Sequence, residues 1–345
     1  MATIRSIAEH ANVSIATVSK VLNGKSGVRE ETRQMILNVA HELNYRPNLN
    51  ARSLKSGRAQ TIGIIAEDLT VFNTPKIIDG VAVACDEANY HYILANLRMF
   101  QRFGHRQAEE KVYTEMVRDA VNVLLARQVD GIIYIGSHSH VISYLPEYSE
   151  VPLVCAYCTC PSLPSVVYDD EKAGYDLTEH LLAVGASRIG MITGPIDSPH
   201  SSSRSMGHMR ALYDHRIPYD PRLTLPGDWE RDSGYEIAGT LLGAGVDAIF
   251  SQNDMMAVGV LDYCNQVGVN VGRDLKLIGF DNLELSSVSR PRLSTVAVPL
   301  FEIGQAAASE LLKILSGEQA LAPKLVKLSC NIITRESTLG TEAPE

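Results

Sequence analysis

Residues 14–20 carry the side chains that could contact a DNA duplex. Their sequence is Ser-Ile-Ala-Thr-Val-Ser-Lys, and helical spacing assigns Val18 to the core side and Ile15 and Lys20 to the outer side. Lys20 can donate to guanine O6 and N7, whereas Ile15 can make only apolar contacts, for instance with a thymine methyl group. The DNA contacts expected in this region are Thr3, Ser14, Ile15, Ala16, Thr17, Ser19, Lys20 and Asn23.

Three short helices would position these residues. Thr3 can cap a first helix, Asn12 tolerates the left-handed conformation of a tight turn, and Ser14 can cap a second helix. A third helix over about 30–43 would end before Pro47. Two helices joined by such a turn and supported by a third make a helix-turn-helix, whose second helix lies in the major groove. The alternative is a three-helix module that binds another protein.

Basic residues are concentrated in this N-terminal segment. Residues 1–58 hold nine basic and four acidic residues, a net charge of +5, whereas the rest of the chain holds 22 basic and 36 acidic residues, a net charge of −14. This asymmetry indicates that only the N-terminal segment meets a polyanion. Chance segregation of solvated charge is the alternative.

The segment 48–55 connects the basic part to the acidic part. It is compatible with a helix but shorter than the roughly 12–15 residues that an isolated helix needs. It is therefore either a linker or a hinge that folds only on DNA. In the second case Leu54 would wedge into a minor-groove base step while Arg52 and Lys55 meet phosphates. The DNA contacts expected here are Asn48, Ala51, Arg52, Leu54 and Lys55.

The rest of the chain alternates apolar strands with helices. This alternation predicts parallel α/β sheets, and because the pattern restarts near residue 188 it predicts two doubly wound lobes. The expected strands are 61–66, 92–95, 131–135, 151–156, 188–193, 248–251, 275–280 and 325–333, and the expected helices include 75–89, about 105–127 and 300–316.

Polar and aromatic side chains follow several of these strands. Ligands of doubly wound sheets bind beyond the carboxyl ends of the strands. Carboxylates and amides can form paired hydrogen bonds with hydroxyl groups, and aromatic rings can cover the apolar faces of a sugar. This set of side chains therefore suits a polyhydroxylated ligand. The candidates found in this way include Glu67, Asp68, Phe72, Asn73, Ser137, His138, Tyr157, Arg204, Trp229, Asn253 and Asp281.

Three cysteines and two histidines raise the question of a metal site. Cys155, Cys158 and Cys160 lie within six residues, and His138 and His140 could emerge nearby. However, Cys155 sits in an apolar strand, and free cysteine behaves as a small hydrophobic residue. No second cysteine pair has the spacing of a zinc finger. We therefore expect neither a metal nor a cofactor.

Several linked motifs of the N-terminal segment resemble the LacI/GalR family of bacterial regulators. They are Thr-Ile-Arg-Ser-Ile-Ala-Glu-His-Ala-Asn-Val-Ser (3–14), Thr-Val-Ser-Lys-Val-Leu-Asn (17–23), Tyr-Arg-Pro-Asn (45–48) and Ala-Arg-Ser-Leu (51–54). Leu54 and Lys55 are similar to the minor-groove pair of the purine-repressor branch. The resemblance implies a homodimer that binds a near-palindromic operator on double-stranded DNA.

The body also resembles this family, and with it the periplasmic sugar-binding fold. The resemblance implies that Tyr168 and Trp229 stack on an effector. It also implies that Arg204, Asn253 and Asp281 hydrogen-bond to the effector. Asp281 could instead cap the following helix, and Trp229 could be simple packing. The matching stretches are 194–207, 227–229, 251–259, 277–281 and 291–296, and the expected effector residues are Phe72, Asn73, His138, Tyr168, Arg204, Trp229, Asn253 and Asp281.

The expected organisation is a helix-turn-helix domain, a hinge and a two-lobed α/β core. Because the family's lobes are joined by three crossings, each lobe is expected to be discontinuous. The expected bounds are 1–46 for the domain, 47–58 for the hinge and 60–345 for the core, with an N-lobe of about 60–165 and 298–324, a C-lobe of about 166–297 and 325–337, and a disordered tail at 338–345.

The expected function is that of a repressor controlled by a small molecule, a sugar or sugar derivative. No long apolar segment or signal peptide is visible, so we expect a cytoplasmic protein without membrane contact. No phosphate-binding loop or nucleophile elbow is visible, so we expect no enzymatic activity. The rival hypotheses are a small-molecule-binding protein without DNA function and an α/β enzyme that turns over its ligand.

Overall fold

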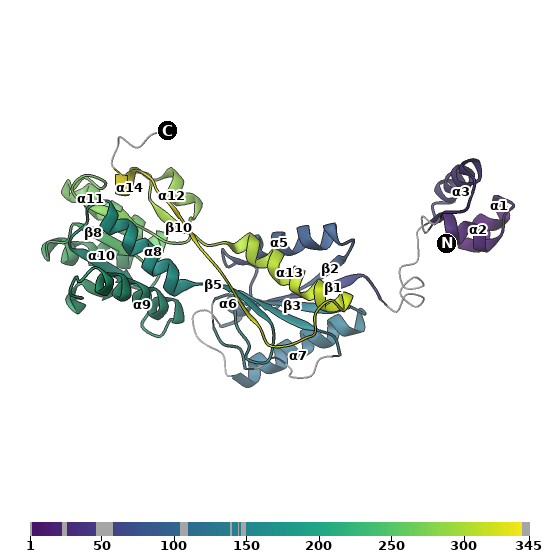
Figure 1. Cartoon of the computed structure of the whole chain (residues 1–345), viewed down its shortest axis with the longest axis horizontal. Helices are drawn as coiled ribbons and strands as arrows, with labels where there is room; N and C mark the ends of the chain where they lie inside the picture. The colour runs from purple at the N-terminus through teal and green to yellow at the C-terminus, as the bar shows by residue number, and fades with distance from the viewer. Residues whose placement is uncertain are drawn as a thin grey trace. The chain divides into compact units, whose positions relative to one another are not determined.

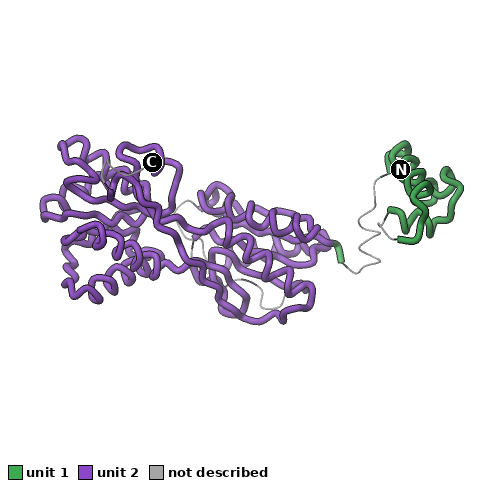
Figure 2. Tube along the Cα trace, turned by 45° about the horizontal axis from the view of Figure 1, so that its top comes forward, with its two compact units in different colours: residues 1–59 green, residues 60–345 purple. Residues whose placement is uncertain are grey.

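The computed structural model describes residues 2–22, 26–45, 58–103, 110–138, 140–143, 145 and 150–339. Two compact units divide the chain, residues 1–59, called the head below, and residues 60–345, called the core (Figure 2). Six of the expected DNA contacts lie outside the described residues: Asn23, Asn48, Ala51, Arg52, Leu54 and Lys55.

The described residues of the head form helices α1 (Ile4–His10), α2 (Ile15–Leu22) and α3 (Glu30–Glu42). Local chemistry sets their ends. The Thr3 hydroxyl accepts from the backbone N–H of Ser6, and the Ser6 hydroxyl accepts from the N–H of Thr3, which makes a reciprocal cap on α1. Asn12 has a φ of 49°, the left-handed conformation expected for the turn before α2. The predicted helix-turn-helix arrangement is therefore present.

The first lobe of the core is built on a six-stranded parallel sheet with the order β11-β5-β4-β3-β1-β2 (Figure 1). Its strands are β1 (Thr61–Ala66), β2 (His91–Asn96), β3 (Gly131–Ile135), β4 (Leu153–Ala156), β5 (Ser165–Tyr168) and β11 (Leu325–Leu328). Its helices are α5 (Thr74–Glu87), α6 (Met99–Phe103), α7 (Glu110–Ala126) and α13 (Leu300–Ser316).

Alternate side chains of this sheet pack on opposite layers of helices. Ile62 and Ile64 belong to the same buried cluster as residues of α5 and α13, while Ile65 belongs to a second cluster with residues of α7. Both faces are therefore covered, which explains why the strand sequences are continuously apolar rather than alternating.

The second lobe holds a four-stranded parallel sheet with the order β7-β6-β8-β9. Its strands are β6 (Ile189–Thr193), β7 (Thr224–Pro226), β8 (Ala248–Ser251) and β9 (Lys276–Ile278), and a separate antiparallel pair is formed by β10 (Thr295–Ala297) and β12 (Asn331–Ile333). Its helices are α8 (Asp170–Ala183), α9 (Pro199–Asp214), the 3₁₀ turn η1 (Pro221–Leu223), α10 (Arg231–Gly243), α11 (Asp254–Val267), α12 (Glu284–Val288) and α14 (Glu336–Leu339).

Three segments of the described chain cross between the lobes, from β5 to α8, from β10 to α13 and from β11 to β12. Two expected lobe boundaries, at 166 and 325, differ from these crossings. The parallel ladder from Leu325–Ser165 to Leu328–Tyr168 keeps both segments in the first sheet. The strand expected at 325–333 is two strands, because the chain leaves one sheet and joins another between them.

The expected tail disorder is wrong for residues 338 and 339, which end α14. Thr338 is 1% exposed and its hydroxyl lies 2.7 Å from the Ser294 hydroxyl. The neighbouring Ser337 hydroxyl donates to the carbonyl of Leu277. Buried hydrogen bonds, rather than apolar packing, hold Ser337 and Thr338 in place. A hydrophobic pattern in the sequence therefore could not predict that these residues are ordered. The remaining tail, 340–345, lies outside the described residues.

Among the described helices, none is both long enough and apolar enough to cross a membrane.

Candidate functional site

Helix α2 of the head turns one face inward and leaves the other exposed. Val18 and Val21 are buried in a core shared by the three helices, whereas Ile15 is 50% exposed. Ile15 therefore remains available for the apolar DNA contact expected of it. The other expected contacts on this face are Ser14, Ala16 and Lys20, all exposed, and Thr17 and Ser19, both half-buried.

Two of the expected DNA contacts, Ser14 and Thr3, also cap helices. Ser14 Oγ accepts from the backbone N–H of Thr17 at 3.1 Å and lies 2.8 Å from the Thr17 hydroxyl, so it caps α2. Thr3 caps α1 in the same way. A capping hydroxyl stays near the helix N-terminus, where anionic phosphates are also favoured.

A second candidate site lies where β5 leaves the first lobe and enters α8. Arg204 of α9 is 3% exposed, and its Nε donates to Asp170 Oδ1 at 2.8 Å. One terminal nitrogen donates to the Tyr168 hydroxyl at 2.8 Å, and the other donates to the carbonyl of Gln252. A buried guanidinium needs such partners, because an unpaired charge out of water is strongly destabilising. Tyr168 belongs to the first sheet and Arg204 to the second lobe, so the cluster joins the lobes.

Rings surround this charged cluster. Tyr157, Tyr168 and His200 have centroids 5.6–6.0 Å apart, and the rings of Tyr168 and His200 are inclined by only 16°. The Phe280 ring centroid lies 3.5 Å from Arg204 Cζ, which places the cation over the ring face. The site therefore offers aromatic surfaces next to fixed hydrogen-bonding groups.

Burial and charge act against each other on Asp170. Burial alone raises the pKa of this carboxyl group, but the charges of His200 and Arg204 outweigh it, so the pKa lies below its ordinary value. His200 Nδ1 lies 2.7 Å from Asp170 Oδ2. Asp170 is therefore an anion that neutralises Arg204 and orients His200.

Trp229 and Asp281 both have left-handed backbones, with φ angles of 74° and 103°. Such conformations are costly for residues other than glycine and are concentrated at ligand sites. Trp229 packs on Gly194, where a Cβ would overlap the indole ring, and lies 5.9 Å from Arg204 Cζ. Among the residues that the structure describes, no hydrogen-bond donor reaches the Asp281 carboxyl group. Burial raises the pKa of that group well above its ordinary value.

Asn253 has a positioning role in this arrangement. Its Oδ1 accepts from the backbone N–H of Met256 and caps α11, and its Nδ2 donates to the carbonyl of Trp229 at 2.8 Å. It thus fixes the loop that carries the indole ring. Direct contact of Asn253 with an effector remains a prediction.

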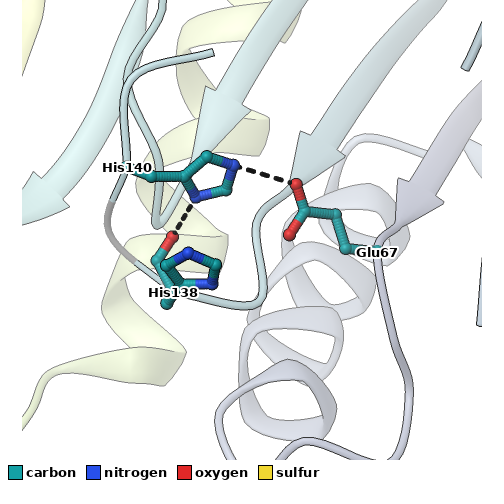
Figure 3. A group of neighbouring side chains, drawn as sticks. All are labelled: Glu67, His138 and His140. Atoms are coloured by element: carbon teal, nitrogen blue, oxygen red, sulfur yellow. Dashed lines mark hydrogen bonds and ion pairs between the residues drawn. The ribbon is translucent and has the colours of Figure 1, made fainter. Parts of the chain in front are cut away.

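The candidates from the first lobe form a separate group. Asn73 is buried and its Nδ2 donates to the carbonyl of Ser137, while its Oδ1 has no partner within the described chain. His138 lies beside Glu67 and His140 (Figure 3). Phe72 is exposed, and none of the described ring or hydrogen-bond contacts joins it to the Arg204 cluster. Their contact with an effector also remains a prediction.

The sequence analysis did not single out Asp170, His200, Gln252 and Phe280. One signal was available, since His200 lies four residues before Arg204 and therefore on the same face of a helix. The role of Asp170 depends on β5, a strand of only four residues that apolar patterning did not reveal.

Both the head and the core match known protein families. Residues 3–48 match the family described as bacterial regulatory proteins, lacI family, and residues 178–338 match the periplasmic binding protein-like domain. The Catabolite control protein A of Priestia megaterium is 32% identical over 97% of this chain and 99% of its own length. The HTH-type transcriptional repressor CytR of Escherichia coli strain K12 is 31% identical over 98% of this chain and 96% of its own.

Solved structures agree with these relatives. The Lac repressor bound to ONPG in its repressed state has a TM-score of 0.78 at 26% identity, covering 98% of this chain and 99% of its own. The complex of the transcriptional regulator CelR with cellobiose has a TM-score of 0.63 at 25% identity, covering 98% and 100%. The expected fold class, a parallel α/β core behind a helix-turn-helix head, is confirmed. The chain belongs to the LacI family of bacterial regulatory proteins.

Proposed function

We propose that this chain is a sequence-specific DNA-binding repressor whose operator affinity is controlled by a sugar-like effector held between the two lobes. One observation carries the proposal: the same chain joins the exposed outer face of α2 to a core in which Arg204 and Tyr168 connect the lobes. The first feature suits a DNA partner, and the second can respond to a small molecule. A homodimer would bind the two halves of a near-palindromic operator.

The head supplies the chemistry for DNA recognition. Lys20 can donate to guanine in the major groove, while Ile15 and Ala16 offer apolar contact to a thymine methyl group. The three side chains are exposed on α2. Positive charge around them supplies affinity for any duplex, and the base contacts supply the sequence preference.

The core supplies the chemistry for a polyhydroxylated effector. The Asp281 carboxyl group can accept hydrogen bonds from hydroxyl groups, and the rings of Tyr168 and Trp229 can cover apolar faces of a sugar. Arg204 is largely occupied by Asp170 and Tyr168, so it holds these groups in place as well as offering its remaining N–H groups. The CelR relative was solved with cellobiose, which supports this class of ligand.

The two sites would be coupled through the arrangement of the lobes. An effector changes operator affinity only if it binds one arrangement of the core more tightly than another. Because Tyr168 and Arg204 belong to different lobes, any rotation between the lobes must alter the hydrogen bond that joins them. Induction and corepression would use the same parts.

The test is selection of duplexes from a randomised library by the purified full-length chain. We expect enrichment of a near-palindromic sequence, and binding measured by fluorescence anisotropy that changes when one member of a panel of sugars, sugar phosphates and nucleosides is added. Lys20→Ala should weaken binding to the selected duplex by about 1–3 kcal/mol. Lys172→Ala removes an exposed lysine from α8 of the core and serves as the matched control.

The outcomes separate the proposal from its rivals. Enrichment of no sequence, with or without the panel, would refute DNA recognition and leave a small-molecule-binding protein. Recovery of the ligand in a chemically changed form would instead indicate an enzyme.

A further inference from the structure

Glu67, His138 and His140 come together at one edge of the first sheet. Glu67 directly follows β1, and the two histidines follow β3. These strands are parallel neighbours, with Ala66 opposite Ile135, so their carboxyl ends meet. The ligand atoms of the three side chains all lie within 4.8 Å of one another (Figure 3).

Hydrogen-bond directions fix the tautomer of His140. Its Nδ1 lies 2.7 Å from the carbonyl oxygen of His138, and a carbonyl oxygen can only accept, so Nδ1 carries the hydrogen. In the neutral ring Nε2 is then the nitrogen with the lone pair. That atom lies 3.2 Å from Glu67 Oε1, which is also an acceptor. Two acceptors at this distance require a positive charge between them.

The same reasoning applies to His138 through Ser137. The Ser137 hydroxyl donates its only proton to Glu67 Oε2 at 2.7 Å. Its oxygen must therefore accept from His138 Nδ1, which lies 3.0 Å away. This leaves Nε2 of His138 as the lone-pair nitrogen. In both imidazoles Nε2 is thus the nitrogen that can donate electrons, and that of His140 lies beside the carboxylate.

We propose that Glu67, His138 and His140 bind one divalent transition-metal ion of the zinc type. Two imidazoles and a carboxylate are a donor set that zinc accepts, with a fourth position left for water or a ligand. Imidazole donors disfavour magnesium and calcium, which prefer oxygen ligands. The proposal does not depend on the sugar-like effector, although His138 is also one of the expected effector contacts.

The surrounding residues hold the proposed ligands as metal sites require. The Tyr134 hydroxyl donates to Glu67 Oε1 at 2.8 Å, and the Ser137 backbone N–H donates to Oε2 at 2.8 Å. The second nitrogen of His140 is tied to a backbone carbonyl, and that of His138 is tied to a hydroxyl. Partners of this kind orient metal ligands and are part of the affinity of a site.

Metal binding requires one imidazole to reorient, because the rings of His138 and His140 are stacked, with centroids 4.4 Å apart and planes inclined by 25°. Ligand atoms on a tetrahedral zinc ion lie about 3.4 Å apart, given bonds of about 2.1 Å. The separation of 3.2 Å between His140 and Glu67 already satisfies this. The longest separations, up to 4.8 Å, must shorten. His138 is exposed, so its ring can turn if its hydrogen bond with Ser137 shifts, whereas Glu67 is 2% exposed and fixed.

The cysteines considered in the sequence analysis are not part of this site. Cys155 and Cys158 are fully buried, and Cys160 nearly so. Within the described residues, the group of potential metal ligands contains the two histidines and a carboxylate but no thiol. The missing partner for the histidines was Glu67, from a strand that is distant in sequence.

Zinc alone is the probe for the test. The full-length protein is freed of metal with a chelator and titrated with Zn²⁺ by calorimetry, and Co²⁺ is used in parallel for its visible absorption. We expect one equivalent per chain, and at least a 100-fold loss of affinity in His138→Gln/His140→Gln. His215→Gln is the matched control, because His215 Nε2 lies 2.7 Å from Glu179 Oε1 at the surface.

A second variant guards against a folding defect. In Glu67→Gln the amide oxygen can accept from Ser137, and the amide nitrogen can donate to the lone pair of His140 Nε2. The metal-free fold should survive, while zinc should no longer raise the thermal midpoint as it does for the original chain. The proposal is overturned if the original chain binds no stoichiometric zinc, or if both variants bind it as tightly as the His215→Gln control. A proton rather than a metal then lies between His140 and Glu67.

Discussion

The carboxyl groups of Asp170 and Asp281 differ in whether neighbouring side chains balance their charge. Asp170 is held as an anion by Arg204 and His200. Asp281 lies close to the same cluster, is half-buried, and has a raised pKa because of burial. A carboxyl group placed in this way is poorly satisfied by the protein and well placed to bond a ligand.

Asp281→Asn tests that assignment. A hydrogen bond contributes about 0.5–1.5 kcal/mol between neutral groups and about 1.5–3 kcal/mol to a charged group, so effector affinity should fall by about 2- to 150-fold. Binding to the selected duplex without effector should be unchanged. Calorimetry with the sugar found in the panel measures the first quantity, and anisotropy measures the second. Asp274→Asn, which alters an exposed aspartate paired with Arg273, is the control. Equal effector affinity in the two variants would remove Asp281 from the site.

Asp254 gives the core a pH dependence of known sign. The side chain is fully buried, and burial raises its pKa from 3.8 to about 7, against the hydrogen bonds from Thr295 and Leu283. The folded state therefore holds a proton that the unfolded state releases above its lower pKa. This stabilisation is complete below about pH 4 and is lost as pH rises towards 7.

Asp254→Asn should remove this dependence. The amide stays uncharged, its oxygen can accept from the Leu283 N–H, and its nitrogen can donate to the Thr295 hydroxyl. The difference between the thermal midpoint of the Asp254→Asn variant and that of the original chain should increase in favour of the variant as pH rises from 5 to 8. Parallel midpoint profiles for the two proteins would show that Asp254 does not carry the buried proton.

At the scale of elements, helices α8 and α9 hold the ligand site in place through close backbone contact. A Cβ at Gly174 would overlap the carbonyl oxygen of Arg204, and a Cβ at Gly207 would overlap that of Glu171. The two glycines thus let the helices approach until Asp170 and Arg204 can bond. The spacing of whole helices, rather than a loop, sets this ion pair.

Gly207→Ala should therefore disturb the packing of helix α9 against helix α8. The added methyl group must push α9 away from α8, at a cost of about 1–3 kcal/mol. The thermal midpoint of the core should fall, and effector affinity should fall with it. Gly243→Ala is the control, because its Cβ would meet nothing within 4 Å and alanine is the better helix former. Equal midpoints for the two variants would contradict the close-contact interpretation.

The parts that sequence reasoning could predict are those set by local chemistry. The cap at Thr3, the left-handed Asn12 and the uninterrupted strand β1 each follow from neighbouring residues. Groups assembled by strand order could not be predicted in this way. Glu67 meets His140 only because β1 pairs with β3. The ladder between β5 and β11 likewise joins segments that no local pattern connects, which explains the misplaced lobe boundaries.

At the scale of the whole chain, charge divides the two proposed activities between the units. Residues 1–58 carry +5 and the rest carries −14, so the core repels the polyanion that the head attracts. The charges of the ligand site are different in kind, because Arg204 and Asp170 are buried and paired. Salt screens exposed charges strongly and buried pairs only weakly.

The two activities should therefore respond differently to salt. Raising salt from 50 to 200 mM should lower affinity for the selected duplex by about 10³- to 10⁵-fold if a dimer makes 6–10 phosphate contacts. Effector affinity, measured by calorimetry on the same full-length protein, should change little over that range. A neutral sugar carries no charge of its own, so its binding releases few counterions. A steep loss of effector affinity would indicate an anionic effector, and duplex binding insensitive to salt would contradict recognition by the basic head.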